Sequence, residues 1–86
     1  MNLRLSSGEP VIAKRFEGNV LTLHSPKAFA PGSPISFDTG DDEPKRAFEG
    51  RTIGSKRIHD GTFEVRLRLV NLRREHRLFL EERLAR

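Results

Sequence analysis

Apolar and charged side chains alternate along residues 63–70 of this chain. The apolar positions are Phe63, Val65, Leu67 and Leu69, and the positions between them are Glu64, Arg66 and Arg68. A period of two over this length predicts a β-strand with one buried and one exposed face. A helix over the same residues would bring Arg66 onto the apolar face, so we interpret the segment as a strand.

The pattern changes directly after this strand. Apolar residues then recur at helical spacing towards the C-terminus, at Leu72, Phe79, Leu80 and Leu84. Asn71 is a residue type that caps helix N-termini, because its side-chain oxygen can accept from the free N–H groups of the first turn. The sequence therefore predicts a C-terminal helix, for which Asn71 is a candidate cap.

The first half of the chain contains signals for several short strands. Residues 1–9 form either a loose arm or a short strand. Residues 11–16 and 20–24 predict a hairpin around the tight turn 17–19, where Gly18 and Asn19 both tolerate positive φ. The prolines in residues 25–32 predict a loop. Residues 33–39 predict the next strand. If the strands close into a barrel, we expect Phe29 of the loop to cover one of its ends.

A longer and less regular strand is predicted over residues 46–59. In a regular strand Phe48 and Ile53 would point to opposite faces of the sheet. A bulge or bend at Gly50 or Gly54 would bring both apolar side chains onto the same face. The Asp-Gly pair at residues 60–61 is a strong hairpin signal. Before this strand, residues 40–45 form a polar loop that holds the acidic cluster 41–43, and we expect it to be mobile.

Together these signals predict one domain over residues 1–86, mainly β. Consecutive hairpins favour an antiparallel sheet, and a sheet this small removes its exposed edges by closing. We expect a small antiparallel β-barrel of about six strands with the C-terminal helix packed on it.

Composition narrows the classes of function. The chain has 16 basic and 12 acidic residues, a net charge of +4 and no cysteine, so disulfides and thiolate metal sites are excluded. No apolar run approaches a membrane span, and no signal peptide is recognisable, so we expect a cytoplasmic protein. The arginines of residues 66–86 suggest an anionic partner, but Glu75, Glu81 and Glu82 interrupt the positive field, so nucleic acid is not the expected one.

Catalytic and metal-binding patterns are not recognisable. The three histidines are far apart in sequence, and no nucleophile–base pair or glycine-rich phosphate loop is present. We therefore expect neither an enzyme nor a metal site.

The order of the elements resembles the PilZ domain family over most of the chain, from about Val11 onward. The stretches that carry the resemblance are Gly-Asn-Val-Leu-Thr-Leu-His-Ser-Pro at 18–26, Ala-Pro-Gly-Ser-Pro-Ile-Ser-Phe at 30–37, Phe-Glu-Gly-Arg-Thr-Ile at 48–53, and the last strand and helix at 60–80. The resemblance implies a bacterial six-stranded barrel with a role in signalling.

PilZ domains typically bind cyclic di-GMP through an Arg-x-x-x-Arg segment before the barrel and an Asp/Asn-x-Ser-x-x-Gly segment on an early strand. With Gly18 at the final glycine, Ala13 replaces the acidic or amide residue and Arg15 replaces the serine. Upstream, Arg4 has no second arginine four residues on. The resemblance thus implies the fold without the standard nucleotide motifs.

Three functions follow as hypotheses. The first is a PilZ-like signalling or adaptor module that acts through protein partners, with Arg66 and Arg68 as a partner or anion contact. The second is a cyclic di-GMP receptor of degenerate mode, whose ligand residues would be Arg4, Lys14, Arg15 and Gly18. The third is a small basic barrel that binds RNA or DNA. No cofactor is expected beyond cyclic di-GMP as a ligand.

Overall fold

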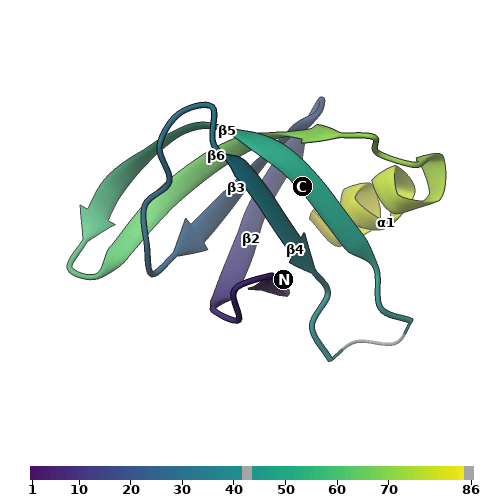
Figure 1. The fold of residues 1–86 in the computed structure, drawn as a ribbon. Coiled ribbons are helices and arrows are strands. Elements are labelled where there is room, and N and C mark those ends of the chain that lie inside the picture. The colour runs from purple at the N-terminus through teal and green to yellow at the C-terminus, as the bar shows by residue number, and fades with distance from the viewer. Residues whose placement is uncertain (42–43, 85–86) are drawn as a thin grey trace.

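The protein folds into a closed six-stranded antiparallel β-barrel followed by one helix (Figure 1), in a computed structural model that describes residues 1–41 and 44–84. The elements are β1 (Asn2–Leu5), β2 (Pro10–Glu17), β3 (Val20–Ser25), β4 (Pro34–Asp38), β5 (Ala47–His59), β6 (Thr62–Val70) and α1 (Arg74–Leu84). The strand order around the barrel is β1-β2-β3-β6-β5-β4, and β1 pairs with β4 to close it. The predicted fold class is confirmed. Asp42 and Glu43 of the acidic cluster lie outside the described residues.

Strand β6 has the buried and exposed faces that its sequence predicts. Val65, Leu67 and Leu69 are buried, whereas Arg66 and Arg68 are exposed. Phe63 is only half-buried, with the Arg57 guanidinium 5.6 Å from its ring centre. The core around β6 is formed by inward residues of every strand and by α1: Leu3, Leu5, Val11, Ala13, Phe16, Leu21, Leu23, Ile35, Phe37, Phe48, Phe79 and Leu80.

Bulges interrupt the regular strand pairing in β5 and β2, and each one changes which face of the sheet the following residues point to. In β5 the pairing with β6 shifts between Thr52 and Gly54, so that Ile53 is the extra residue, as the parity break predicts. A second shift in β5 falls at Ile58. In β2 the pairing with β3 shifts between Ala13 and Arg15, which leaves Lys14 as the extra residue.

Residues 1–9 include a short strand rather than a loose arm. β1 supplies Leu3 and Leu5 to the core and pairs with both β2 and β4. The two hairpin turns form where expected, with Gly18 and Gly61 at positive φ. Phe29, in the loop between β3 and β4, is half-buried against the core, and its backbone N–H donates to Ser55 Oγ at 2.9 Å.

The helix does not begin where the sequence predicts. Asn71 has a φ of 52°, in the left-handed region, and its amide donates to Glu49 Oε2 at 3.1 Å. An N-cap residue needs an extended backbone and a side chain that accepts from the helix. The Arg73 carbonyl instead accepts the N–H of Arg77 at 2.9 Å, so Arg73 is the last residue before the helix. The prediction of an Asn71 cap is therefore wrong, because this residue reverses the chain after β6.

Helix α1 packs through one short apolar face. Phe79 and Leu80 are buried, and Leu72 and Leu84 are partly buried against the same core. Its contacts with the strands are mainly with β2, and Figure 1 shows it at one end of the barrel. No helix in the part of the chain that the structure describes has the length and apolarity needed to cross a membrane.

Candidate functional site on the outer barrel face

The bulge in β2 places two consecutive basic side chains on the outside of the barrel. Consecutive residues of a regular strand face opposite sides, so one of Lys14 and Arg15 would normally point inward. Because Lys14 is the extra residue, both are exposed, while Ala13 before them and Phe16 after them are buried. The bulge therefore doubles the positive charge that this strand presents to solvent.

Strand β6 adds Arg66 and Arg68 to the same outer face. Thr22 of β3 lies opposite Arg15 on one side and opposite Arg66 on the other. Arg15 and Arg66 thus flank the same threonine from neighbouring strands. The structure brings these two residues, predicted for separate sites, onto one surface.

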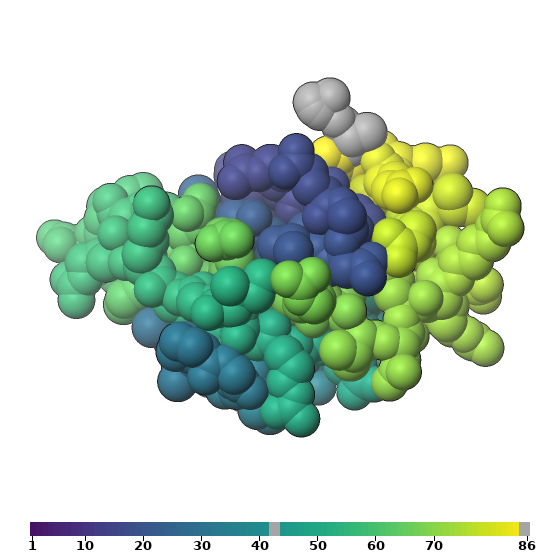
Figure 2. Space-filling model, turned by 90° about the horizontal axis from the view of Figure 1, so that it is seen from above, coloured from purple at the N-terminus to yellow at the C-terminus, as the bar shows by residue number. Residues whose placement is uncertain are grey.

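A fourth arginine extends this surface across β5. Arg51 lies directly opposite Arg68, and Val20 lies opposite Arg68 on its other side. We call the four residues Arg15, Arg51, Arg66 and Arg68 the arginine strip. Figure 2 views the molecule from above and shows β2 and β3 (blue-purple) lying beside β6 (green) and β5 (teal).

Few contacts within the protein neutralise the positive charge of the arginine strip. Within residues 1–41 and 44–84 the ion pairs join Arg4 to Asp41, Lys27 to Glu9 and Lys56 to Glu64, and none includes a strip arginine. Arg51 donates to the Gly32 carbonyl at 3.2 Å. Like charges directly opposite each other on paired strands are destabilising. The Arg51–Arg68 pair is therefore repulsive, and neither residue has an ion pair among the described residues.

Three carboxylates border the strip, and two of them have other partners. Glu64 Oε1 lies 4.0 Å from Lys56 Nζ, and Glu49 accepts from Asn71. Glu17, at the end of β2, lines a hollow together with Arg15 and Arg66. Of the three bordering carboxylates, Glu17 is thus the one that shares a hollow with strip arginines.

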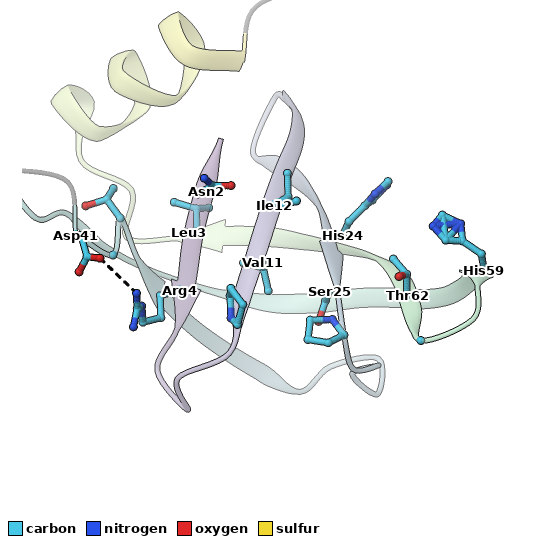
Figure 3. Close-up of a pocket in the computed structure, with 15 residues that line it drawn as sticks. Asn2, Leu3, Arg4, Val11, Ile12, His24, Ser25, Asp41, His59 and Thr62 are labelled. Atoms are coloured by element: carbon cyan, nitrogen blue, oxygen red, sulfur yellow. Dashed lines mark ion pairs between the residues drawn. The ribbon is translucent and has the colours of Figure 1, made fainter.

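Arg4 lies apart from the other residues of the predicted nucleotide site. It lines a groove of about 780 Å³ formed by β1, β2, β3 and the β5–β6 turn (Figure 3). Its Nη2 atom is 3.7 Å from Asp41 Oδ2, and its side chain is half-exposed. Lys14 and Arg15 line a different cavity, of about 630 Å³, beside the end of α1. The structure therefore does not gather Arg4, Lys14 and Arg15 around one cavity.

Gly18 has a structural partner in the C-terminal helix. Its carbonyl accepts from Arg77 Nη1 at 3.2 Å, and Arg77 Nη2 donates to Asn19 Oδ1 at 2.5 Å. Arg77 thereby holds α1 against the β2–β3 turn. Other basic groups of this region are also engaged, because Arg46 and Arg83 both lie over the Phe79 ring, 4.1 and 4.7 Å from its centre.

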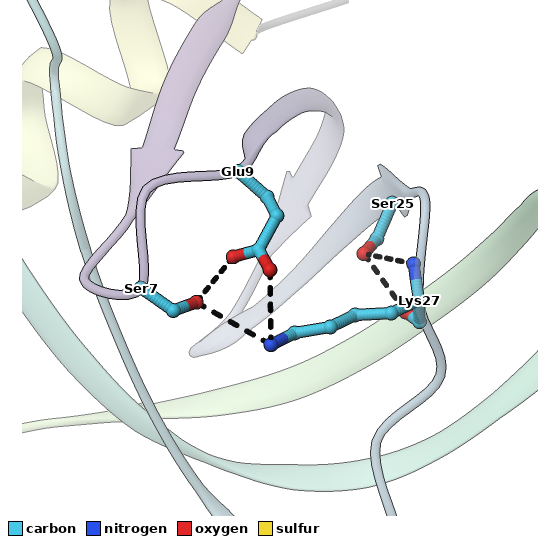
Figure 4. A network of polar contacts seen from close by, with 4 residues as sticks. All are labelled: Ser7, Glu9, Ser25 and Lys27. Atoms are coloured by element: carbon cyan, nitrogen blue, oxygen red, sulfur yellow. Dashed lines mark hydrogen bonds and ion pairs between the residues drawn. The ribbon is translucent and has the colours of Figure 1, made fainter.

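Among the described residues, one carboxyl group has a pKa shifted from its ordinary value, that of Glu9 in the β1–β2 turn, which is not part of the strip. The Ser7 hydroxyl donates to Glu9 and is the largest cause that lowers the pKa of Glu9 below its ordinary value. Lys27 contributes in the same direction, with its Nζ atom 3.4 Å from Glu9 Oε2. Figure 4 shows this network joining the β1–β2 turn to the loop after β3. Its geometry is that of a tether between two loops.

Two members of the surface could not be singled out from the sequence, Thr22 and Arg51. Thr22 lies in a strand with an ordinary alternating pattern and Arg51 in the irregular strand β5, and only the strand register shows what lies beside each of them. The described residues also contain no group of three or more His, Asp or Glu side chains that could hold a metal ion.

Comparisons with models of known protein families, with curated proteins and with solved structures each gave no match. The class of protein is therefore described from the fold and the arginine strip alone. The protein is a small closed β-barrel with a C-terminal helix and an arginine-rich outer face.

Proposed function

We propose that this chain is a PilZ-like bacterial signalling or adaptor module that acts in the cytoplasm through a protein partner, without standard cyclic di-GMP binding. The order of elements that resembles the PilZ family supports the family assignment, together with a six-stranded barrel that ends in a helix. The replaced motif residues Ala13 and Arg15 support the loss of the standard nucleotide mode.

The observation that carries the proposal is the pair Arg66 and Arg68, exposed on β6 without an ion pair among the described residues. Strand pairing closes the barrel, so strand addition is limited to the part of β5 beyond Thr52, where β4 no longer pairs with it. Recognition at the strip itself then uses side chains of the outer face. Arginine suits this role because its planar guanidinium matches a carboxylate with two parallel hydrogen bonds.

The direct test places a photo-crosslinking amino acid at Val70, which is exposed beside the strip, and irradiates cells that express the protein. We expect a discrete cross-linked protein that disappears when Arg66→Gln and Arg68→Gln are added. The matched control carries the crosslinker at Leu78, an exposed apolar residue of α1. The same products from both positions, unchanged by the arginine substitutions, would contradict the proposal.

Cyclic di-GMP binding by a degenerate mode is the second candidate. It is favoured by the exposure of both Lys14 and Arg15 on the β2 bulge. Calorimetric titration of the protein with cyclic di-GMP decides it. On our proposal the titration yields no binding heat, whereas a saturable heat that Lys14→Gln and Arg15→Gln abolish would establish the receptor instead.

Nucleic acid is the remaining alternative, supported by the arginine strip alone. Phosphate contacts make such binding fall steeply with salt. We expect no saturable binding of mixed RNA or DNA oligonucleotides at physiological salt. A tight complex whose affinity declines linearly with salt on a logarithmic scale would favour this alternative.

A further inference from the structure

A small hollow of about 220 Å³ lies within the arginine strip, on the outer face of β2, β3 and β6. Its lining residues are Arg15, Glu17, Val20, Thr22 and Arg66. The two arginines stand on either side of Thr22, because both are its cross-strand neighbours. The hollow therefore presents two guanidinium groups around one hydroxyl-bearing residue.

Thr22 is unusual for an outward-facing strand residue because it is only 4% exposed. Leu21 and Leu23 on either side of it point into the core, so the Thr22 side chain belongs to the outer face. The long neighbouring arginine side chains leave little of this side chain open to solvent. Among the described residues, no hydrogen bond engages its hydroxyl group. It remains available as a donor at the floor of the hollow.

We infer that this hollow is the specific anion site of the arginine strip, and that its ligand is a side-chain carboxylate from an acidic segment of a protein partner. Arg15 and Arg66 donate to the carboxylate from the two sides, and the Thr22 hydroxyl donates from below. The inference rests on the proposed function, since it names the chemistry of the partner that the strip contacts.

The composition of the hollow favours a protein carboxylate over a nucleic acid. Glu17 lines the same hollow, and its charge repels a continuous phosphate backbone. A protein segment avoids this repulsion by placing a hydrogen-bond donor next to its acidic residue, where Glu17 accepts it. The chain also has no Tyr or Trp on which bases could stack.

The test measures, by fluorescence anisotropy, the affinity of the full chain for a fluorescein-labelled peptide of alternating glutamate and serine, whose hydroxyl groups supply the donors beside each carboxylate. Thr22→Val keeps the β-branched shape and removes only the hydroxyl donor, so we expect about fivefold weaker binding from the loss of one hydrogen bond. Arg15→Lys keeps the charge but loses the planar fork, and we expect a similar weakening. Arg74→Gln removes an exposed charge at the start of α1 and should change affinity by less than about twofold.

Unchanged peptide affinity in both Thr22→Val and Arg15→Lys would overturn the site. Equal weakening in Arg74→Gln would also overturn it, because it would show attraction by net charge alone. The amide NMR spectrum of each variant checks that the barrel is intact. An oligothymidylate of matched charge serves as the nucleic-acid arm, and tighter binding of it than of the peptide would overturn the choice of ligand.

The two failures are distinguishable. If the hollow is wrong but the proposed function holds, the Val70 cross-link still depends on Arg66 and Arg68 while Thr22→Val binds the peptide normally. If the proposed function fails, the Val70 cross-link is absent or insensitive to those arginines, whatever the peptide titration gives.

Discussion

Gly50 shows at the scale of one residue how closely β5 and β6 approach. A Cβ atom at this position would lie 2.6 Å from the Arg68 carbonyl oxygen and 2.8 Å from a methyl carbon of Leu67. The first contact is with backbone, which cannot rotate away. Glycine is therefore required here by space, and not by a bulge, which lies three residues further on at Ile53.

Gly50→Ala should destabilise the protein by about 1–3 kcal/mol, because the added methyl group overpacks the strand pair. The matched control is Gly54→Ala in the same strand, where the added carbon meets nothing within 4 Å and φ is not positive. Urea unfolding measures both variants. Equal stability of the two would contradict the close approach of β5 and β6.

The hydrogen bond from Ser7 is the largest single cause of the lowered pKa of Glu9. In an NMR pH titration we expect Glu9 to titrate below its ordinary value, and Ser7→Ala to raise that pKa towards it. Lys27→Ala should also raise it, since the hydrogen bond and the positive charge of Lys27 both lower the pKa of Glu9. A lowered folded-state pKa stabilises the fold above the unfolded pKa, and this contribution disappears as the pH falls through the folded pKa. No change in the Glu9 titration on Ser7→Ala would refute the assignment.

At the scale of elements, the sequence predicts where strands form better than it predicts which residues of neighbouring strands lie opposite each other. The alternation in residues 63–70 and the Gly18 and Asp60–Gly61 turns suffice to place β2, β3 and β6. A hairpin extended without bulges from the 60–61 turn would place Arg51 opposite Val70. The bulges at Ile53 and Ile58 place it opposite Arg68 instead, and such shifts arise from packing between strands that no local pattern encodes.

The helix boundary was mispredicted for a related reason. Asn is favoured both as a helix cap and at positive φ, and the local sequence does not separate these two uses. The choice depends on the return of the chain from β6 to the barrel, where the Asn71 amide reaches Glu49 of β5. The docking of α1 is likewise set by a long-range contact, from Arg77 to Gly18 and Asn19.

Removing this contact tests how α1 is held. Arg77→Ala should cost about 1–2 kcal/mol, because it deletes two hydrogen bonds that join the helix to the β2–β3 turn. Hydrogen exchange should quicken at α1 amides while the β3 and β6 amides stay protected. Arg74→Ala, at an exposed position of the same helix, is the control and should leave both unchanged. Identical exchange in the two variants would mean that Phe79 and Leu80 alone dock the helix.

At the scale of the whole molecule, the core residues and the arginine strip lie on opposite faces of the barrel wall. Inward side chains of all six strands and of α1 form one core, and pairing of β1 with β4 leaves the barrel closed. The outward side chains are not needed for this core, so they can be charged. The arginine strip lies among them, on β2, β6 and β5. The sequence predicts Arg66 and Arg68 as a partner or anion contact, and it predicts Arg15 as part of a separate nucleotide site. That Arg15 and Arg66 both lie opposite Thr22 could be seen only from the register of β2, β3 and β6.

The proposed function requires that the barrel folds without help from the strip arginines, which leaves them available for binding. The most direct measurement is the urea unfolding free energy of the Arg66→Gln, Arg68→Gln double variant against the unmodified protein. We expect a difference within about 0.5 kcal/mol, tending towards higher stability, because the opposed Arg51–Arg68 charges are relieved. A loss of more than about 2 kcal/mol would contradict the account, since it would show that these arginines hold the barrel together.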